Sequence, residues 1–160
     1  MEKGALFSPC RSYRYALWRV WDDARPFVLF VCLNPSTADE RRNDPTVRRC
    51  VGFARAWRYG GVYVANLFAY RATDPQVLKC APHPVGPESD RWLKELAEGA
   101  EIVVAAWGNH GTLMNRAQEV LSWLPKAHYL VMTKGGQPGH PLYLRKDCQP
   151  QPFPNALVRE

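Results

Sequence analysis

The sequence predicts an α/β fold, a three-layer α/β/α sandwich with a mostly parallel four-stranded central sheet and an N-terminal antiparallel hairpin. Apolar runs of strand length alternate with segments of helical pattern, an order typical of parallel strands joined by right-handed helical crossovers. The 160 residues fit one domain over residues 1–160. Apolar residues make up 46% of the chain and charged residues 22%, which excludes a largely disordered protein.

The first half of the chain supplies the hairpin, one helix and a second buried strand. Residues 13–21 alternate apolar and polar side chains, as in a half-buried strand. Residues 27–33 form a continuous apolar run, typical of a strand buried on both faces, and we expect these two strands to pair. Asp44 before Pro45 predicts the start of a helix that ends near Trp57. Residues 62–65 then predict the next strand.

The second half repeats this alternation. Helical pattern covers residues 87–98 and 112–124, and apolar strand-like runs cover residues 102–106 and 127–132. The tail from Gly135 onwards is rich in proline. Because each strand is followed by a helix, we expect helices on both faces of the sheet.

The sequence also excludes several classes of protein. No apolar run approaches the roughly 18 residues of a membrane span, and residues 1–8 lack the apolar region of a secretory signal, so we expect no membrane contact. Five cysteines without a C-x-x-C pair indicate reduced thiols and a cytoplasmic location. The histidines show no metal-ligand spacing, so we expect neither a metal nor another cofactor. We expect a monomer.

The basic charge suggests a polyanionic partner. The formal net charge is +6, and 15 of the 21 basic residues are arginine. Arginine presents a planar fork of donors that suits phosphate better than the lysine point charge does. A polyanion such as a nucleic acid is therefore a candidate partner, and a solvated basic surface is the alternative interpretation.

Polar loops follow the four strands that we expect to be parallel. These loops cover residues 34–39, 66–74, 107–111 and 133–141. Ligands of open α/β sheets bind beyond the carboxyl ends of the strands. We therefore expect Asn34, Asn66, Asn109 and His140 to converge on one cleft.

The same loops carry motifs that resemble known families. The stretches LNPSTAD, DPTxRRC, NLFAxRATDP and HPLY resemble a bacterial and phage family of small domains of unknown function. The loops are also similar to those of the uracil-DNA glycosylase superfamily, whose motifs are matched by residues 32–35, Asn66, Trp107-Gly108 and, in part, His140-Pro141. Cys32 stands where the first motif has glycine, and Leu142-Tyr143 stand where the last has Ser-Pro. The resemblance implies a uracil-DNA glycosylase-like fold.

It also implies an enzyme that hydrolyses the N-glycosidic bond of a flipped uracil-like or modified base. Such an enzyme needs a positioned water, a base pocket and stabilisation of the departing base. We assign water orientation to Asn34 and a hydrogen bond to the leaving base to His140, as the catalytic pair. The candidate base-binding residues are Asn66, Phe68, Tyr70 and Asn109. The candidate contacts to the DNA backbone are Ser36, Arg48, Arg49, Arg71, Lys134 and Arg145.

Other interpretations of these residues stay open. Asn34 and Asn66 also suit turns that end strands, and His140 also suits an ordinary loop. Aromatic residues at this density are common in protein cores. Asp39 or Asp44 could supply a carboxylate base, although Asp44 also suits a helix cap. The alternative function is a non-catalytic module of the same fold that binds nucleic acid or a nucleotide.

Overall fold

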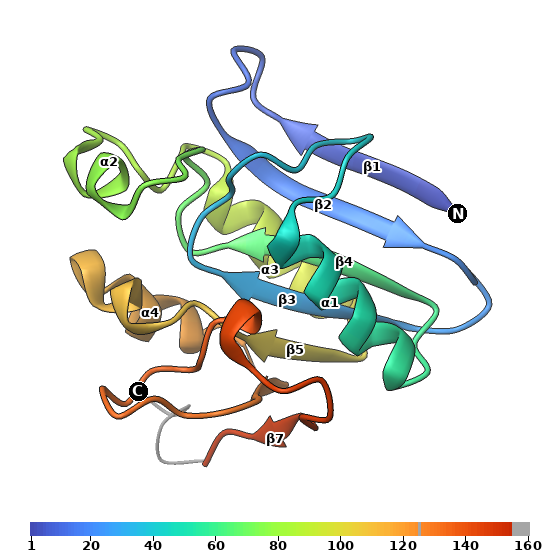
Figure 1. Cartoon of the computed structure of the whole chain (residues 1–160). Coiled ribbons are helices and arrows are strands. Elements are labelled where there is room, and N and C mark those ends of the chain that lie inside the picture. The colour runs from blue at the N-terminus through green and yellow to red at the C-terminus, as the bar shows by residue number, and fades with distance from the viewer. Residues whose placement is uncertain (125, 155–160) are drawn as a thin grey trace.

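The structure is a computed structural model that describes residues 1–124 and 126–154, and it confirms the predicted α/β class (Figure 1). Over these residues, one mixed sheet contains seven strands in the order β1-β2-β4-β3-β5-β6-β7. The strands are β1 (Glu2–Phe7), β2 (Arg14–Val20), β3 (Phe27–Cys32), β4 (Gly61–Asn66), β5 (Ile102–Ala105), β6 (Ala127–Tyr129) and β7 (Gln151–Pro152).

The expectation of a mostly parallel four-stranded sheet is wrong, because antiparallel strands extend the four parallel strands at both edges of the sheet. Strand β2 pairs with β1 and β4, not with β3 as expected, so the N-terminal hairpin is β1 with β2. Strand β3 lies between β4 and β5 and is parallel to both. Its apolar character on both faces suits this central place. Gly4 lets β1 approach β2 closely, since a Cβ atom there would lie 2.3 Å from the ring of Trp18.

The parallel strands β4, β3, β5 and β6 end at a common edge of the sheet. Cys32 of β3 is in register with Asn66 of β4, and Val31 is in register with Ala105 of β5. The loops that follow these strands therefore start at nearly the same level. This alignment is what places the polar loops next to one another.

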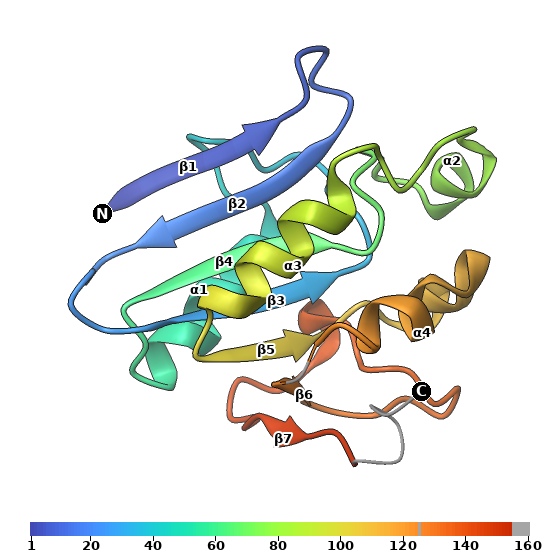
Figure 2. The ribbon, with the colours of Figure 1, turned by 180° about the vertical axis from the view of Figure 1, so that it is seen from behind.

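Helices cover both faces of the sheet, and each face has its own apolar core. Helix α1 (Pro45–Ala56) packs on one face through Val47, Cys50 and Phe53 (Figure 1). Helices α3 (Ser89–Gly99) and α4 (Arg116–Leu121) pack on the other face (Figure 2). Asp44 is the predicted cap of α1, and its Oδ1 accepts a hydrogen bond from the amide of Val47 at 2.9 Å.

The remaining differences from the predicted elements are local. Residues 109–115 form a 3₁₀ segment before α4, and Met114 and Asn115 adopt positive φ angles of 54° and 56° there. The last parallel strand is shorter than expected, and α2 (Pro75–Cys80) was not predicted. None of the helices in the described part of the chain has the length and apolar content needed to cross a bilayer.

Candidate functional site

A cleft of about 680 Å³ opens at the carboxyl ends of the parallel strands. Asn34, Asn109 and His140 line it together, as three of the four residues that we expected to converge. Its other walls include residues 44–46 at the start of α1, Trp107-Gly108 after β5, and Ala72, Thr73 and Pro75 where α2 begins. A volume of this size suits a small ligand such as a nucleotide.

The side chain of Asn34 is held in one orientation by backbone carbonyls. Its Nδ2 donates to the oxygens of Ala72 at 2.7 Å, Pro35 at 3.1 Å and Tyr70 at 3.4 Å. No donor among the described residues bonds its Oδ1. Because the amide nitrogen is committed to the protein, Asn34 offers its oxygen as a hydrogen-bond acceptor.

His140 is held as a neutral donor. Its Nδ1 accepts a hydrogen bond from the amide of Leu142 at 3.2 Å, so the neutral ring carries its proton on Nε2. Burial lowers the pKa of His140, and the negative charge of Asp44 opposes this effect only in part. Gly108 lies next to His140, since a Cβ atom at Gly108 would lie 3.7 Å from the Cβ of His140. The ring is therefore neutral near pH 7.

This pKa shift predicts a pH-dependent contribution to stability. The neutral ring of His140 takes up a second proton less readily in the folded state than in the unfolded state, where the pKa of histidine is about 6.5. The contribution of His140 is thus complete above that pH and decreases as the pH falls below it. We expect wild type to lose more unfolding free energy than His140→Gln between about pH 7 and 5. Urea denaturation of both proteins measures this, and parallel pH profiles would contradict it.

Two nearby carboxylates are occupied by backbone amides. Asp44 lines the cleft but bonds the amide of Val47 through Oδ1 and that of Ala38 through Oδ2 at 3.3 Å. Asp39 accepts from the amides of Arg41 at 2.9 Å and Arg42 at 2.8 Å, which lowers the pKa of its carboxyl group, and it does not line the cleft. Each carboxylate is thereby fixed in a structural role, Asp44 as the cap of α1 and Asp39 in the turn that precedes it.

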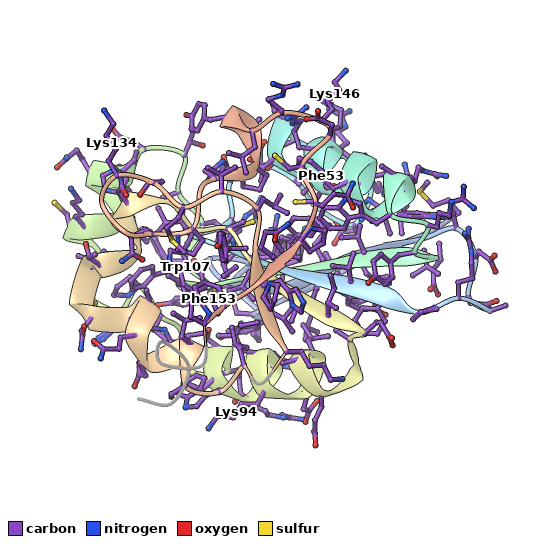
Figure 3. All side chains as sticks on the ribbon, turned by 90° about the horizontal axis from the view of Figure 1, so that it is seen from below. Phe53, Lys94, Trp107, Lys134, Lys146 and Phe153 are labelled. Atoms are coloured by element: carbon purple, nitrogen blue, oxygen red, sulfur yellow. The ribbon has the colours of Figure 1, made fainter. Side chains whose placement is uncertain are left out.

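A second network fixes the loop after β6 against the loop after β5. The indole Nε1 of Trp107 donates to Oε1 of Gln137 at 2.9 Å, and Trp107 itself is buried (Figure 3). The hydroxyl of Thr133 donates to Oδ1 of Asn109 at 2.5 Å and accepts from the amide of Gln137. Asn109 therefore offers its Nδ2 donors. Thr133 and Gln137 were not identified from the sequence, and only their place in a polar loop indicated them.

The other candidate base-binding residues do not line the cleft. Asn66 is 4% exposed, and its Oδ1 accepts from Nη2 of Arg14 at 3.4 Å. Phe68 is completely buried in the core. The ring of Tyr70 packs edge-on against Tyr13 at 5.8 Å between ring centroids. In this structure, these three side chains contact other parts of the protein and do not form the wall of the cleft.

The candidate backbone-binding residues are spread around the cleft. Ser36 lines it, and Arg71 lines an adjoining pocket that also includes Ser36. Arg49 donates to the carbonyl oxygens of Pro141 and Leu144, and so joins α1 to the loop that carries His140. The three others are exposed: Arg48 on α1, Lys134 at the periphery of the molecule (Figure 3), and Arg145 in an ion pair with Asp147 at 3.1 Å.

Two buried arginines of β2 were not identified from the sequence. Arg19 donates to Oδ1 of Asn43 at 2.8 Å and to the carbonyl oxygen of Asp39 at 2.6 Å. Arg14 donates to the carbonyl oxygen of Ala38 at 3.1 Å, and its Nε has no partner in the described residues. Burial lowers the pKa of Arg14 to about 10. Both side chains hold the segment between Asn34 and α1 in place.

Comparisons with known proteins identify the family. Searches of curated proteins and of solved structures returned no match. Residues 14–142 match one protein family, described as Protein of unknown function (DUF1643). This range contains Asn34, Asn109 and His140. The chain therefore belongs to the DUF1643 family of proteins of unknown function.

Proposed function

We propose that the protein hydrolyses the N-glycosidic bond of a uracil-like or modified base that is extruded from DNA into the cleft. The observation that carries the proposal is the pairing of a fixed acceptor, Oδ1 of Asn34, with a fixed donor, Nε2–H of His140, in one cleft. Such a pair matches the two needs of the reaction, a water held for attack and a leaving base whose negative charge is stabilised.

In the proposed reaction, Oδ1 of Asn34 accepts a hydrogen bond from the attacking water. The water oxygen bonds to C1′ of the sugar while the C1′–N bond breaks, and the departing base takes the bonding electron pair. Nε2–H of His140 donates a hydrogen bond to the base as its negative charge develops. The proton lost by the water passes to solvent, and the base takes up a proton after it leaves.

A second function is favoured by one specific observation. The one carboxylate among the described cleft residues, that of Asp44, is held as the cap of α1 by two backbone amides, and Asn34 carries no charge. A cleft that positions a base without a charged group to drive bond cleavage suits a module that binds nucleic acid or a nucleotide. The non-catalytic alternative therefore remains the competing proposal.

An excision assay separates the two functions. Labelled DNA, single-stranded and duplex, would carry uracil, a mismatched thymine, hypoxanthine or a hydroxymethylated pyrimidine, and alkali would reveal abasic sites. We expect at least one of these bases to be released by wild type and not by the Asn34→Ala/His140→Ala double variant. Binding of the same DNA with no excision of any base would favour the non-catalytic module. No binding and no excision would contradict both.

A further inference from the structure

A polar pocket of about 340 Å³ adjoins the cleft. Ser36, Ala72 and Thr73 line both spaces, so a ligand in the cleft can extend into this pocket without crossing another element. The pocket's other described walls are Arg11 and Ser12, in the turn between β1 and β2, and Tyr70-Arg71, in the loop after β4. No acidic residue lines it in the described part of the chain.

Contacts with backbone carbonyls and an aromatic ring hold the two arginines of the pocket in place. The guanidinium of Arg71 donates through Nε to the carbonyl oxygen of Ser36 at 3.4 Å and through Nη1 to that of Arg11 at 3.3 Å. Both guanidiniums contact the ring of Phe7, with centroid distances of 3.9 Å for Arg11 and 4.9 Å for Arg71. These contacts fix Arg71 while Nη2 has no protein partner in the described residues.

The charges around the pocket do not cancel. Arg11 forms an exposed ion pair with Glu40 at 3.0 Å, whereas Arg71 forms no ion pair with any described carboxylate. Two arginines therefore face one carboxylate, and a positive charge is left at the boundary with the cleft. A multivalent anion would balance this charge.

Hydroxyl groups complete the donor set. The Oγ of Ser36 and the Oγ1 of Thr73 are 2.7 Å apart, so one hydroxyl donates to the other and the second keeps its proton for a ligand. Guanidinium and hydroxyl donors together match the several oxygen acceptors of a phosphate ester. A neutral sugar or base would leave the charge of Arg71 unbalanced.

We propose that this pocket binds a phosphate group attached to the nucleotide whose base lies in the cleft. The proposal rests on the proposed function, since it takes the cleft to hold a nucleobase. The phosphate is either a diester of a DNA strand or the monoester of a free nucleotide, and both present the same non-bridging oxygens. The pocket thus contributes binding energy away from the bond that breaks.

The salt dependence of binding tests the proposal. The probe is a fluorescein-labelled oligothymidylate of about 11 nucleotides, and wild type is compared with Arg71→Gln, Arg71→Lys and Arg55→Gln. We expect the slope of log K against log salt concentration to become shallower by about 0.7 in Arg71→Gln, because one phosphate contact of a single strand is lost. Arg71→Lys keeps the charge and should keep the slope. Arg55 is the matched control, because it lies in the last turn of α1, whereas the first turn of that helix lines the cleft.

A competition arm identifies the source of the phosphate. Thymidine 5′-monophosphate and thymidine each compete with the labelled strand for wild type and for Arg71→Gln. If the monophosphate displaces the strand from wild type more strongly than thymidine does, and Arg71→Gln loses this preference, the result supports a phosphate monoester. A slope change without a preference for the monophosphate supports the diester. Thermal unfolding of each variant shows that the fold is retained.

The possible failures are distinguishable. If the strand binds and Asn34→Ala stops excision, but the salt slopes of wild type and Arg71→Gln are equal, the phosphate site is overturned and the proposed function stands. If neither the strand nor thymidine nor the monophosphate binds to wild type, the proposed function fails and the phosphate site fails with it.

Discussion

Replacing Asn34 by alanine should lower the rate of base excision by about 100- to 1000-fold, the usual cost of losing one group that orients the reacting atoms. The substitution removes the only group that we assign to the attacking water, and it leaves the base contacts unchanged. Affinity for the substrate DNA should therefore change little. Single-turnover excision and equilibrium binding, measured on the same DNA, separate these two effects. A variant that excises at the wild-type rate would contradict the assignment.

Asn34→Asp is the isosteric control for this prediction. It introduces a negative charge, but it replaces the Nδ2 donor by an oxygen next to the carbonyl of Ala72, whose oxygen is 2.7 Å from Nδ2 in wild type. We expect the repulsion to displace the side chain, so that excision does not become faster. A rate above that of wild type would show that charge matters more here than the fixed orientation of the amide.

Replacing Trp107 by alanine should lower the free energy of unfolding by about 3–5 kcal/mol, the usual cost of deleting a large buried aromatic side chain. Trp107 is 1% exposed, and its indole holds Gln137 of the loop after β6. Loss of the ring leaves a cavity and also releases that loop from the cleft wall. Urea denaturation followed by circular dichroism measures the change.

Trp107→Phe is the control that separates packing from hydrogen bonding. It keeps an aromatic ring in the core and loses the bond to Gln137, a loss that costs about 1 kcal/mol on average. We expect Trp107→Phe to retain most of the stability that Trp107→Ala loses. Equal losses in the two variants would show that the hydrogen bond, and not the buried ring, dominates.

The sequence predicted those parts of the fold that depend on local patterns. The apolar run of β3 indicated a strand buried on both faces, and Asp44 with Pro45 indicated where α1 begins. The neighbours of β2 were predicted wrongly because strand pairing depends on contacts between segments distant in sequence. Nothing in residues 14–20 says that β2 pairs with β4 across more than 40 residues.

As with the fold, only part of the candidate site could be predicted from the sequence. Strand polarity alone places Asn34, Asn109 and His140 at one edge, so their presence in one cleft follows from the order of strands and helices. The buried state of Asn66 does not follow, because it depends on Arg14, a residue that the strand pattern assigns to the solvent. The contacts of Arg49 do not follow either: we expected this residue to contact the DNA backbone, and in the structure it donates to the carbonyl oxygens of Pro141 and Leu144.

The buried arginines of β2 make the cleft sensitive to a strand that does not line it. On one wall, Asn34 bonds the carbonyl oxygen of Ala72, and on the other, Arg49 bonds that of Pro141 in the loop of His140. The segment 38–43 spans the two walls, and Arg14 and Arg19 hold that segment. The position of that segment therefore depends on β2 of the N-terminal hairpin. We therefore expect substitutions of Arg14 or Arg19 to change the shape of the cleft without removing a residue that lines it.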